Sequence, residues 1–450
     1  MLAIVLAHAA LLFLVLPRVS TRLAPSYNQD QYADGYELLA SNLAAGQGYR
    51  FYPETARTTM REPGYPVFLA ALYVTVGTSF ALVKLANLLL ALATAGLIVR
   101  IAATLELPRF CGNWFWLLLP PILFLFHPAT LVAESRGGVE VLFSFLVTLF
   151  LLSVCRAAQS GSWKDYLLSG LVLGVTVLVR STPLLFPVFL ALYLLFLHRP
   201  RNTVRLVVRN LAVLTLATVA VLFPWIVRNY RLTGAFIPTS SVLGVSAQAG
   251  QYINEHLFEG RPFWLLDREA SRERDLIAGR LGLRFEDGPQ GYYQTFYRPQ
   301  DEVEFSNYLL RQVRSAYRRS PLLLLRCIAQ NTVNFWVGGK TLVATVANTC
   351  LQLPLLLLAL AGIPLCLKSP AGHVAVVIIL FIVYLMAVHA TVLAQARYSV
   401  PLIPTLCIFA SAGLGRLQHF LLHPAKTAGQ PDGTARAHSS SSANPADSAA

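Results

Sequence analysis

Long runs of apolar residues recur along almost the whole chain, and many approach the roughly 20 residues that a helix needs to cross a membrane. Helices are the only open-chain way to do so, because lipid offers the backbone no hydrogen-bond partners. Of 450 residues, 55% are hydrophobic and only 13% are charged, whereas soluble domains have roughly 25% charged residues. The sequence therefore predicts an all-α polytopic membrane protein.

The apolar runs predict ten or eleven transmembrane helices. Residues 1–17 are expected to form an uncleaved anchor, because this run lacks the basic start of a signal peptide. Full-length spans are expected at about 79–104, 113–132, 138–157, 166–180, 184–198, 207–226, 344–367, 373–394 and 398–422. Residues 321–338 are a further, weaker candidate.

These runs divide the chain into six parts. The expected parts are a first anchor at 1–17, an external loop at 18–78, a transmembrane core at 79–227, an external soluble loop at 228–320, C-terminal transmembrane helices at 321–422 and a tail at 423–450. The tail is rich in Ala and Ser without apolar periodicity, and is expected to be disordered because it cannot bury enough apolar surface.

Basic residues predict the orientation in the membrane. The clearest basic cluster, residues 198–209, is expected in the cytoplasm. Alternation of the spans then places the loops at 18–78 and 228–320 together on the opposite, non-cytoplasmic face. Arg18 and Arg22 count against this orientation, although the first helix does not always dominate.

The net charge of +14 does not indicate a nucleic-acid partner, because Lys and Arg lie mostly in short segments between apolar runs, as cytoplasmic loops require. The six cysteines show no CxxC spacing. Neither a disulfide framework nor a zinc site is therefore expected.

The first external loop contains two carboxylates at helical spacing. Asp30 and Asp34 would share one face of a helix that continues through Leu43 and ends near Gly46. If that helix lies flat on the membrane, a carboxylate on this face could serve as a general base at a lipid head group. The alternative is a helix cap with solvated acids.

The same loop ends with Arg61-Glu-Pro-Gly-Tyr-Pro66 and a short apolar run at 66–77. The run is too short to span a membrane and is expected to lie at the interface. The prolines and the charged pair suit a rigid scaffold, or simply mark the start of a helix.

Three further arginines lie at the ends of apolar runs. Arg180 and Arg228 are expected at the external face, and Arg397 lies on a side that depends on whether 321–338 spans. Arginine in such a position can bind a phosphate through its planar fork of donors. The alternative is snorkelling of the side chain at a helix end.

The order of these elements resembles the GT-C glycosyltransferases, especially the branch with protein O-mannosyltransferases and lipid A aminoarabinose transferases. The resemblance covers most of residues 20–410. It is carried by Asp30-Gln-Tyr-Ala-Asp-Gly-Tyr36 with Gly46-Gln-Gly-Tyr49, Arg61-Glu-Pro-Gly-Tyr-Pro-Val-Phe-Leu-Ala70, Gly170-Leu-Val-Leu-Gly through Arg180-Ser-Thr-Pro, Pro224-Trp-Ile-Val-Arg-Asn229, and Arg397-Tyr to Pro404. It implies a GT-C type bundle of about 10–11 helices, with juxtamembrane helices in the first external loop and one larger external loop.

The resemblance also implies an activity. A sugar would pass from a polyprenyl-phosphate donor to a lipid, glycan or protein acceptor on the non-cytoplasmic face, by inverting general-base catalysis. The implied membrane is the plasma (inner) membrane of a bacterium. No cofactor is expected to be required, although some relatives use a divalent metal.

Roles for individual residues follow from the resemblance. Related enzymes often place the acid four residues before an aromatic that matches Tyr36, but that position is Tyr32, between Asp30 and Asp34. Asp30 is preferred as the base, with Asp34 as an orienting group. The donor phosphate is assigned to Arg61, Arg180, Arg228 and Arg397, and substrate positioning to Tyr36, Glu62 and Tyr65.

Two other classes of protein remain as alternatives, a transporter or flippase for lipid-linked sugars and a non-catalytic binder of such lipids. A transporter is expected to show paired halves with matched broken helices. No such internal symmetry is visible in the sequence.

Overall fold

A computed structural model describes residues 2–18, 34–107, 115–197, 204–257, 261–291 and 294–422. Within these ranges the regular secondary structure is helical, apart from one two-stranded sheet. Asp30, residues 198–203 of the basic cluster and the tail at 423–450 lie outside the described residues.

The protein is an integral multi-pass membrane protein. Among the described residues, six helices are long and apolar enough to cross a membrane. They are α5 (Phe80–Thr104), α9 (Glu140–Ser160), α12 (Val204–Thr233), α17 (Leu342–Leu367), α18 (Gly372–Ala390) and the segment Ala396–Gln418. This last segment comprises η6 (Ala396–Leu402) and most of α19 (Ile403–Leu422). A seventh span results if α7 (Phe115–Leu125) and α8 (Pro128–Arg136), which meet at a bend of 48°, form one crossing.

Among the described residues, six or seven of the ten or eleven expected spans are long and apolar enough to cross a membrane, and whether the others cross stays a prediction. The other apolar runs form shorter helices: the anchor helix that begins with α1 (Leu2–Ala10), α10 (Trp163–Val179), α11 (Phe186–Leu192) and α16 (Pro321–Val337). Helix α10 ends at Val179 with Arg180 as its C-cap, and α11 begins at Phe186 with Pro187 in its first turn, where proline is tolerated.

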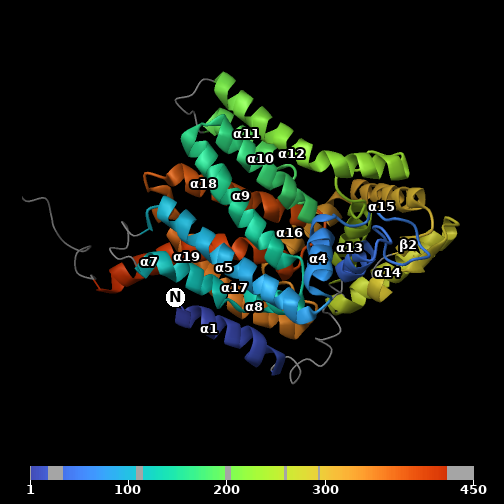
Figure 1. The fold of residues 1–450 in the computed structure, drawn as a ribbon, viewed down its shortest axis with the longest axis horizontal. Helices are drawn as coiled ribbons and strands as arrows, with labels where there is room; N and C mark the ends of the chain where they lie inside the picture. Colours follow the sequence, from blue (N-terminus) through green and yellow to red (C-terminus); the bar gives the residue numbers. More distant parts are fainter. Residues whose placement is uncertain are drawn as a thin grey trace, which may run out of the picture.

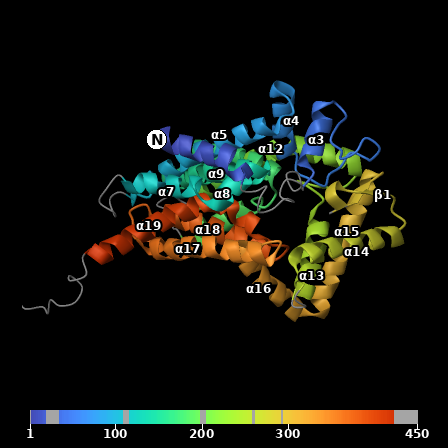
Figure 2. The same ribbon diagram turned by 90° about the horizontal axis from the view of Figure 1, so that it is seen from below.

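A second unit stands at one end of the apolar bundle (Figures 1 and 2). It contains α3 (Tyr36–Ala44), α13 (Leu243–His256), α14 (Phe263–Arg280), β1 (Phe285–Asp287), β2 (Gln294–Phe296) and α15 (Pro299–Arg319). Strands β1 and β2 are antiparallel, with Phe285 opposite Phe296. We call this group of elements the outer unit.

The outer unit joins the two loops that the sequence places on one face of the membrane. The amide of Ala56 donates to the carbonyl of Phe296 at 3.0 Å, and the amide of Ser241 donates to the carbonyl of Thr59 at 2.9 Å. Apolar side chains from both loops, including Tyr49 and Phe305, share one small core. The two loops therefore lie on the same side, while the identity of that side stays a prediction.

A buried carboxylate fastens the first loop to α15. Glu302 is 4% exposed and accepts hydrogen bonds from the hydroxyl of Thr58, from both the amide and the hydroxyl of Thr59, and from the hydroxyl of Ser241. Four donors compensate the loss of water around a buried carboxylate. The chain that leads to Arg61 is thereby fixed.

The short apolar run forms α4 (Gly64–Val76), which confirms the expected helix at 66–77. Its first residue packs directly on the end of α10, because a Cβ on Gly64 would lie 2.8 Å from the backbone carbonyl of Leu178 and 2.7 Å from Val179. Backbone cannot move aside as a flexible side chain can. This close approach brings Arg61 and Glu62 beside Arg180.

We expect Gly64→Ala to destabilise the protein by about 1–3 kcal/mol, because the added methyl group overpacks this contact. Gly96→Ala is the matched control, since Gly96 lies inside α5 with nothing within 4 Å of the added Cβ. Thermal unfolding in detergent measures both variants. Equal melting temperatures for Gly64→Ala and the wild type would contradict the packing argument.

Candidate functional site: a cationic cluster around Asp34

Asp34 lies where the outer unit meets the apolar bundle, and it forms ion pairs with two arginines that are distant in sequence. Its Oδ2 lies 3.1 Å from Nη1 of Arg397, and its Oδ1 lies 3.5 Å from Nη2 of Arg61. The side chains of Asp34 and Arg61 are 26% and 15% exposed. Partial burial of this kind strengthens ion pairs relative to surface pairs.

Two further cations act on the same carboxylate. Burial by itself would raise the pKa of Asp34, but the positive charges of Arg397, Arg61, Arg180 and Lys340 outweigh that effect and hold the pKa well below its usual value. Asp34 is therefore ionised at physiological pH. We call Arg61, Arg180, Lys340 and Arg397 the cationic cluster, in which four positive charges surround one negative charge.

Arg180 supplies unused hydrogen-bond donors to this cluster. Its guanidinium lies over the ring of Tyr398 at 4.7 Å and near the ring of Phe143 at 5.9 Å. No hydrogen bond of its side chain is present among the described residues, although a guanidinium has five N–H donors. A planar, positively charged fork held on an aromatic ring is well suited to a phosphate.

Aromatic residues from the C-terminal helices form the support for Arg180 and Arg397. The ring of His389, near the end of α18, stacks on Tyr398 with centroids 4.6 Å apart and an interplanar angle of 15°. Arg397 also donates to the hydroxyl of Tyr398 at 3.4 Å. Both rings are more than nine-tenths buried, so the support is rigid.

Glu62 links three segments around the cluster. Its Oε1 accepts from the amide of Ser181 at 3.3 Å and from the hydroxyl of Ser240 at 2.9 Å. Glu62 is only 4% exposed. The carboxylate holds the loop that follows Arg180, and a role of Glu62 in positioning a substrate stays a prediction.

Two tyrosines assigned to the substrate are buried in the protein. Tyr65 has no exposed surface, and its hydroxyl donates to the carbonyl of Gly137. Tyr36 is 7% exposed, packs edge-on against Tyr65 and lies under the guanidinium of Arg61 at 5.4 Å. Burial leaves Tyr65 no surface to touch a ligand in this structure, so its predicted role in substrate positioning would act through the residues that it packs against. Tyr36 supports Arg61.

Arg228 does not join the cluster. Its Nη1 donates to the carbonyl of Thr58 at 2.8 Å and to the side chain of Asn229 at 2.9 Å, and its guanidinium lies over the ring of Trp225 at 4.5 Å. It is absent from the charges that lower the pKa of Asp34. The structure thus brings together Arg61, Arg180 and Arg397, and gives Arg228 a role in holding the first external loop.

Asp34 does not lie in a helix, so the expected helix face shared with Asp30 is not formed at Asp34. Helix α3 begins at Tyr36, and Gly35 precedes it with a left-handed φ of 69°. Asp34 therefore lies before the helix and turns towards Arg61 and Arg397. Its ion pairs also rule out a solvated helix cap, while Asp30 lies outside the described residues.

Sequence analysis missed four residues near this site, Glu37, Lys340, His389 and Tyr398. Lys340 lies in the loop between α16 and α17, and the Gly338 carbonyl in that loop accepts from the amide of Ala396 at 2.9 Å. No local pattern marks Glu37, Lys340 or His389 as part of a site. Only Tyr398, which follows Arg397 in a quoted motif, had a signal that could have been used.

Glu37 carries a carboxyl group with a raised pKa in the outer unit. Burial raises the pKa of Glu37 to about 7, a hydrogen bond with its own backbone opposes this, and the charge of Asp34 adds to it. Its Oε2 is buried without a hydrogen-bond partner in the described part of the chain. Glu37 is therefore a proton acceptor whose pKa lies near neutrality.

This raised pKa predicts a pH-dependent stability. The folded protein binds more protons at Glu37 than the unfolded chain between pH 4.5 and about 7, so the contribution of Glu37 is present at low pH and is lost as pH rises through 7. We expect Glu37→Gln to be more stable than the wild type at pH 8, by up to ~3 kcal/mol in the free energy of unfolding, and therefore to unfold at a higher temperature. Well below pH 4.5, where the carboxyl group is protonated in both the folded and the unfolded state, the difference should vanish. A pH-independent difference in thermal unfolding would contradict the assignment.

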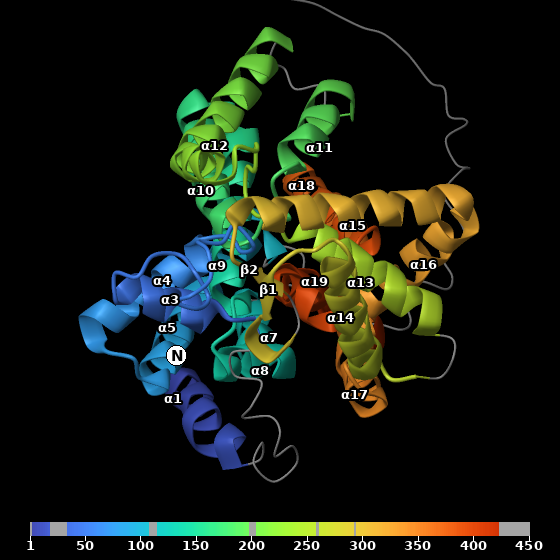
Figure 3. The same ribbon diagram turned by 90° about the vertical axis from the view of Figure 1, so that its right-hand side faces the viewer.

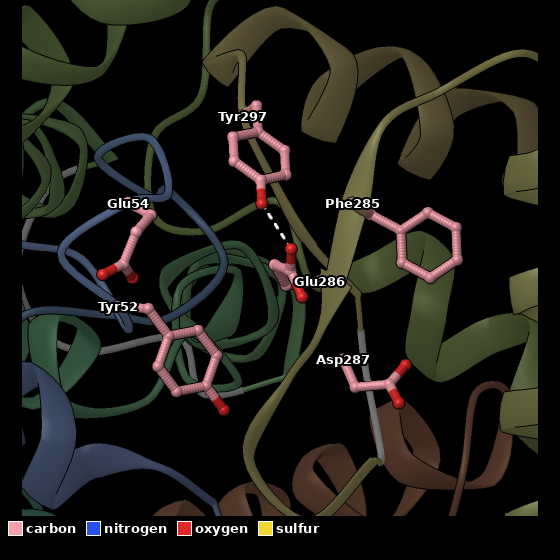
Figure 4. Close-up of a pocket in the computed structure, with 6 residues that line it drawn as sticks. All are labelled: Tyr52, Glu54, Phe285, Glu286, Asp287 and Tyr297. Atoms are coloured by element: carbon pink, nitrogen blue, oxygen red, sulfur yellow. Dashed lines mark hydrogen bonds between the residues drawn. The ribbon is translucent and has the colours of Figure 1, made fainter.

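A separate pocket of about 580 Å³ opens on the outer unit (Figure 4). It is lined by Tyr52, Glu54, Phe285, Glu286, Asp287 and Tyr297. The hydroxyl of Tyr297 donates to Glu286 (Figure 4). Three carboxylates repel a phosphate, so this pocket does not suit the charged part of a lipid-phosphate donor. The cationic cluster does.

Metal and family evidence add no further assignment. No group of three or more His, Cys, Asp or Glu side chains in the described ranges could hold a metal ion, and the expected independence of a metal stays a prediction. Neither the known protein families nor the curated proteins gave a match to this chain. The fold defines an integral multi-pass membrane protein, and the cationic cluster is the feature that bears on its activity.

Proposed function

We propose that this integral membrane protein is a glycosyltransferase that takes a sugar from a polyprenyl-phosphate donor. The acceptor would be a lipid, glycan or protein on the non-cytoplasmic face. The observation that carries the proposal is the cationic cluster, in which Arg61, Arg180, Arg397 and Lys340 act on one carboxylate at the junction of the outer unit and the bundle.

The location of the cluster suits an amphipathic donor. A polyprenyl chain partitions into the apolar region, while its phosphate and sugar remain near the membrane surface. The surplus of positive charge favours the phosphate in the ground state. It favours the phosphate more strongly as the glycosidic bond breaks, because the leaving group then gains negative charge.

In the proposed reaction, the acceptor hydroxyl or amine attacks the anomeric carbon while the bond from that carbon to the phosphate oxygen breaks. The bonding electrons leave with the polyprenyl phosphate, next to Arg180 and Arg397. A carboxylate takes the proton of the acceptor. Inversion at the anomeric carbon follows from the single displacement.

The surroundings of Asp34 support the preference for Asp30 as the base. A carboxylate held by two arginines, with a lowered pKa, is a weak proton acceptor. Asp34 is better suited to orient Arg61 and Arg397. Glu37, with its raised pKa, is an additional carboxyl group that can accept a proton near pH 7.

The proposal is tested by incubating the purified protein with radiolabelled polyprenyl-phosphate sugars and membrane extract as a source of acceptors. Label is expected to move to an acceptor and to depend on the protein. Arg180→Ala protein is the control, because it is expected to retain the fold and lacks the guanidinium proposed to bind phosphate.

Two outcomes would favour the rival classes. Movement of lipid-linked sugar across reconstituted vesicles, without labelled acceptor, would indicate a transporter. Saturable donor binding with neither transfer nor transport, across a panel of sugars, would indicate a non-catalytic binder. Either result would overturn the proposed glycosyl transfer.

A further inference from the structure

A stripe of arginines runs along the outward face of α15. Arg311, Arg314 and Arg318 are exposed and follow the i, i+3, i+7 spacing of one helix face. The buried residues Phe305 and Leu309 lie on the opposite face. Among the described residues, no carboxylate forms an ion pair with these three arginines.

The helix dipole does not account for this stripe. Cations near a helix C-terminus are stabilised within the last turn only. That argument covers Arg318 and Arg319, which lie in the last turn of α15. Arg311 and Arg314 lie five or more residues before the end of the helix at Arg319. Together with Arg318, they place three positive charges on one exposed helix face.

An apolar stripe follows immediately on α16. Leu322 and Leu325, 66% and 62% exposed, lie on the same helix face as Val333, which is 60% exposed. The opposite face of α16 packs through Cys327 and Phe335. Exposed leucines directly after a row of arginines match the pattern of a segment at a membrane surface.

The arrangement of the helices places this corner beside the bundle. Figure 3 looks along the long axis of Figure 1 and shows α15 lying across the view, with its junction to α16 projecting to one side. Figure 2 shows the same junction at the end of the bundle where the outer unit begins. The junction of α15 and α16 therefore projects sideways at the end of the bundle where the outer unit begins.

We propose that the corner formed by the end of α15 and the start of α16 binds anionic phospholipid head groups of the surrounding bilayer. Arg311, Arg314 and Arg318 contact lipid phosphates, and Leu322 and Leu325 insert into the interface. The inference does not depend on glycosyl transfer. It gives α15 and α16 a role in holding the outer unit at the membrane surface.

Native mass spectrometry of the full-length protein in a neutral detergent tests this inference, with phosphatidylglycerol and phosphatidylcholine of identical acyl chains as probes. An arginine near an anionic surface contributes on the order of fivefold in affinity. We expect the triple variant Arg311→Gln, Arg314→Gln and Arg318→Gln to bind phosphatidylglycerol at least ~10-fold more weakly than the wild type. Its binding of phosphatidylcholine should not change.

The matched control removes three exposed arginines from α14, as Arg268→Gln, Arg272→Gln and Arg280→Gln. It loses the same charge and should bind phosphatidylglycerol as the wild type does. Any lipid bound at the cationic cluster is common to all three proteins. Equal binding by the corner variant and the wild type, or an equal loss in the α14 control, would overturn the inference. The single variant Arg314→Gln provides the same comparison if the triple variant does not fold.

Discussion

Replacing Arg180 with alanine is expected to lower kcat/KM for the polyprenyl-phosphate donor by about 10²–10³, because a preorganised donor to the developing phosphate charge is removed. The protein should remain folded, since Arg180 is the residue after α10 and the direct contacts of its side chain within the described structure are with the rings of Phe143 and Tyr398. Initial rates at varied donor concentration measure the effect. Thermal unfolding verifies the fold.

Arg180→Lys separates charge from geometry at the same position. Lysine keeps the positive charge but loses the planar fork and much of the stacking on Tyr398. We therefore expect an intermediate loss, about tenfold. Arg280→Ala, an exposed arginine on α14, is the control for a general loss of charge and should leave the kinetics unchanged. Wild-type donor kinetics in folded Arg180→Ala would reduce Arg180 to a snorkelling residue.

Asp30→Asn is expected to lower kcat by about 10²–10⁴ while donor binding stays nearly intact, because the amide matches the carboxylate in size but cannot accept a proton. Asp34→Asn should cost less in kcat and should raise the donor KM, because one oxygen still accepts from Arg397 or Arg61 while the charge that orders them is lost. Single-turnover and steady-state rates separate these effects.

The order of the two aspartate variants decides between the two assignments. A larger loss of kcat in Asp34→Asn would move the base to Asp34, despite its lowered pKa. Full activity in both single variants and in the double variant would remove this loop from catalysis. Glu37→Gln then becomes the decisive variant, because Glu37 is the neighbouring carboxyl group with a pKa near 7.

Local sequence signals predicted the elements of the site better than its contacts. Gly46 follows the end of α3 and Pro63 directly precedes the start of α4, as expected. Glycine and proline favour helix ends wherever they occur, because of their own backbone preferences. Arg180 was correctly placed at the end of an apolar helix. The sequence around Arg228 could not predict its hydrogen bond to the carbonyl of Thr58, because Thr58 belongs to the first external loop, which is distant in the sequence.

The sequence by itself determined that this chain is a helical, multi-pass membrane protein, because the free energy of placing a helix in lipid is nearly a sum over its own residues. It also determined which charged residues lie next to the apolar runs. Only the tertiary structure decided that Asp34 meets Arg397, a partner 363 positions away. The same packing added Lys340 to the cationic cluster and buried Tyr65. Contacts of this kind depend on how helices pack against each other, and the composition of a single segment contains no information about its distant neighbours.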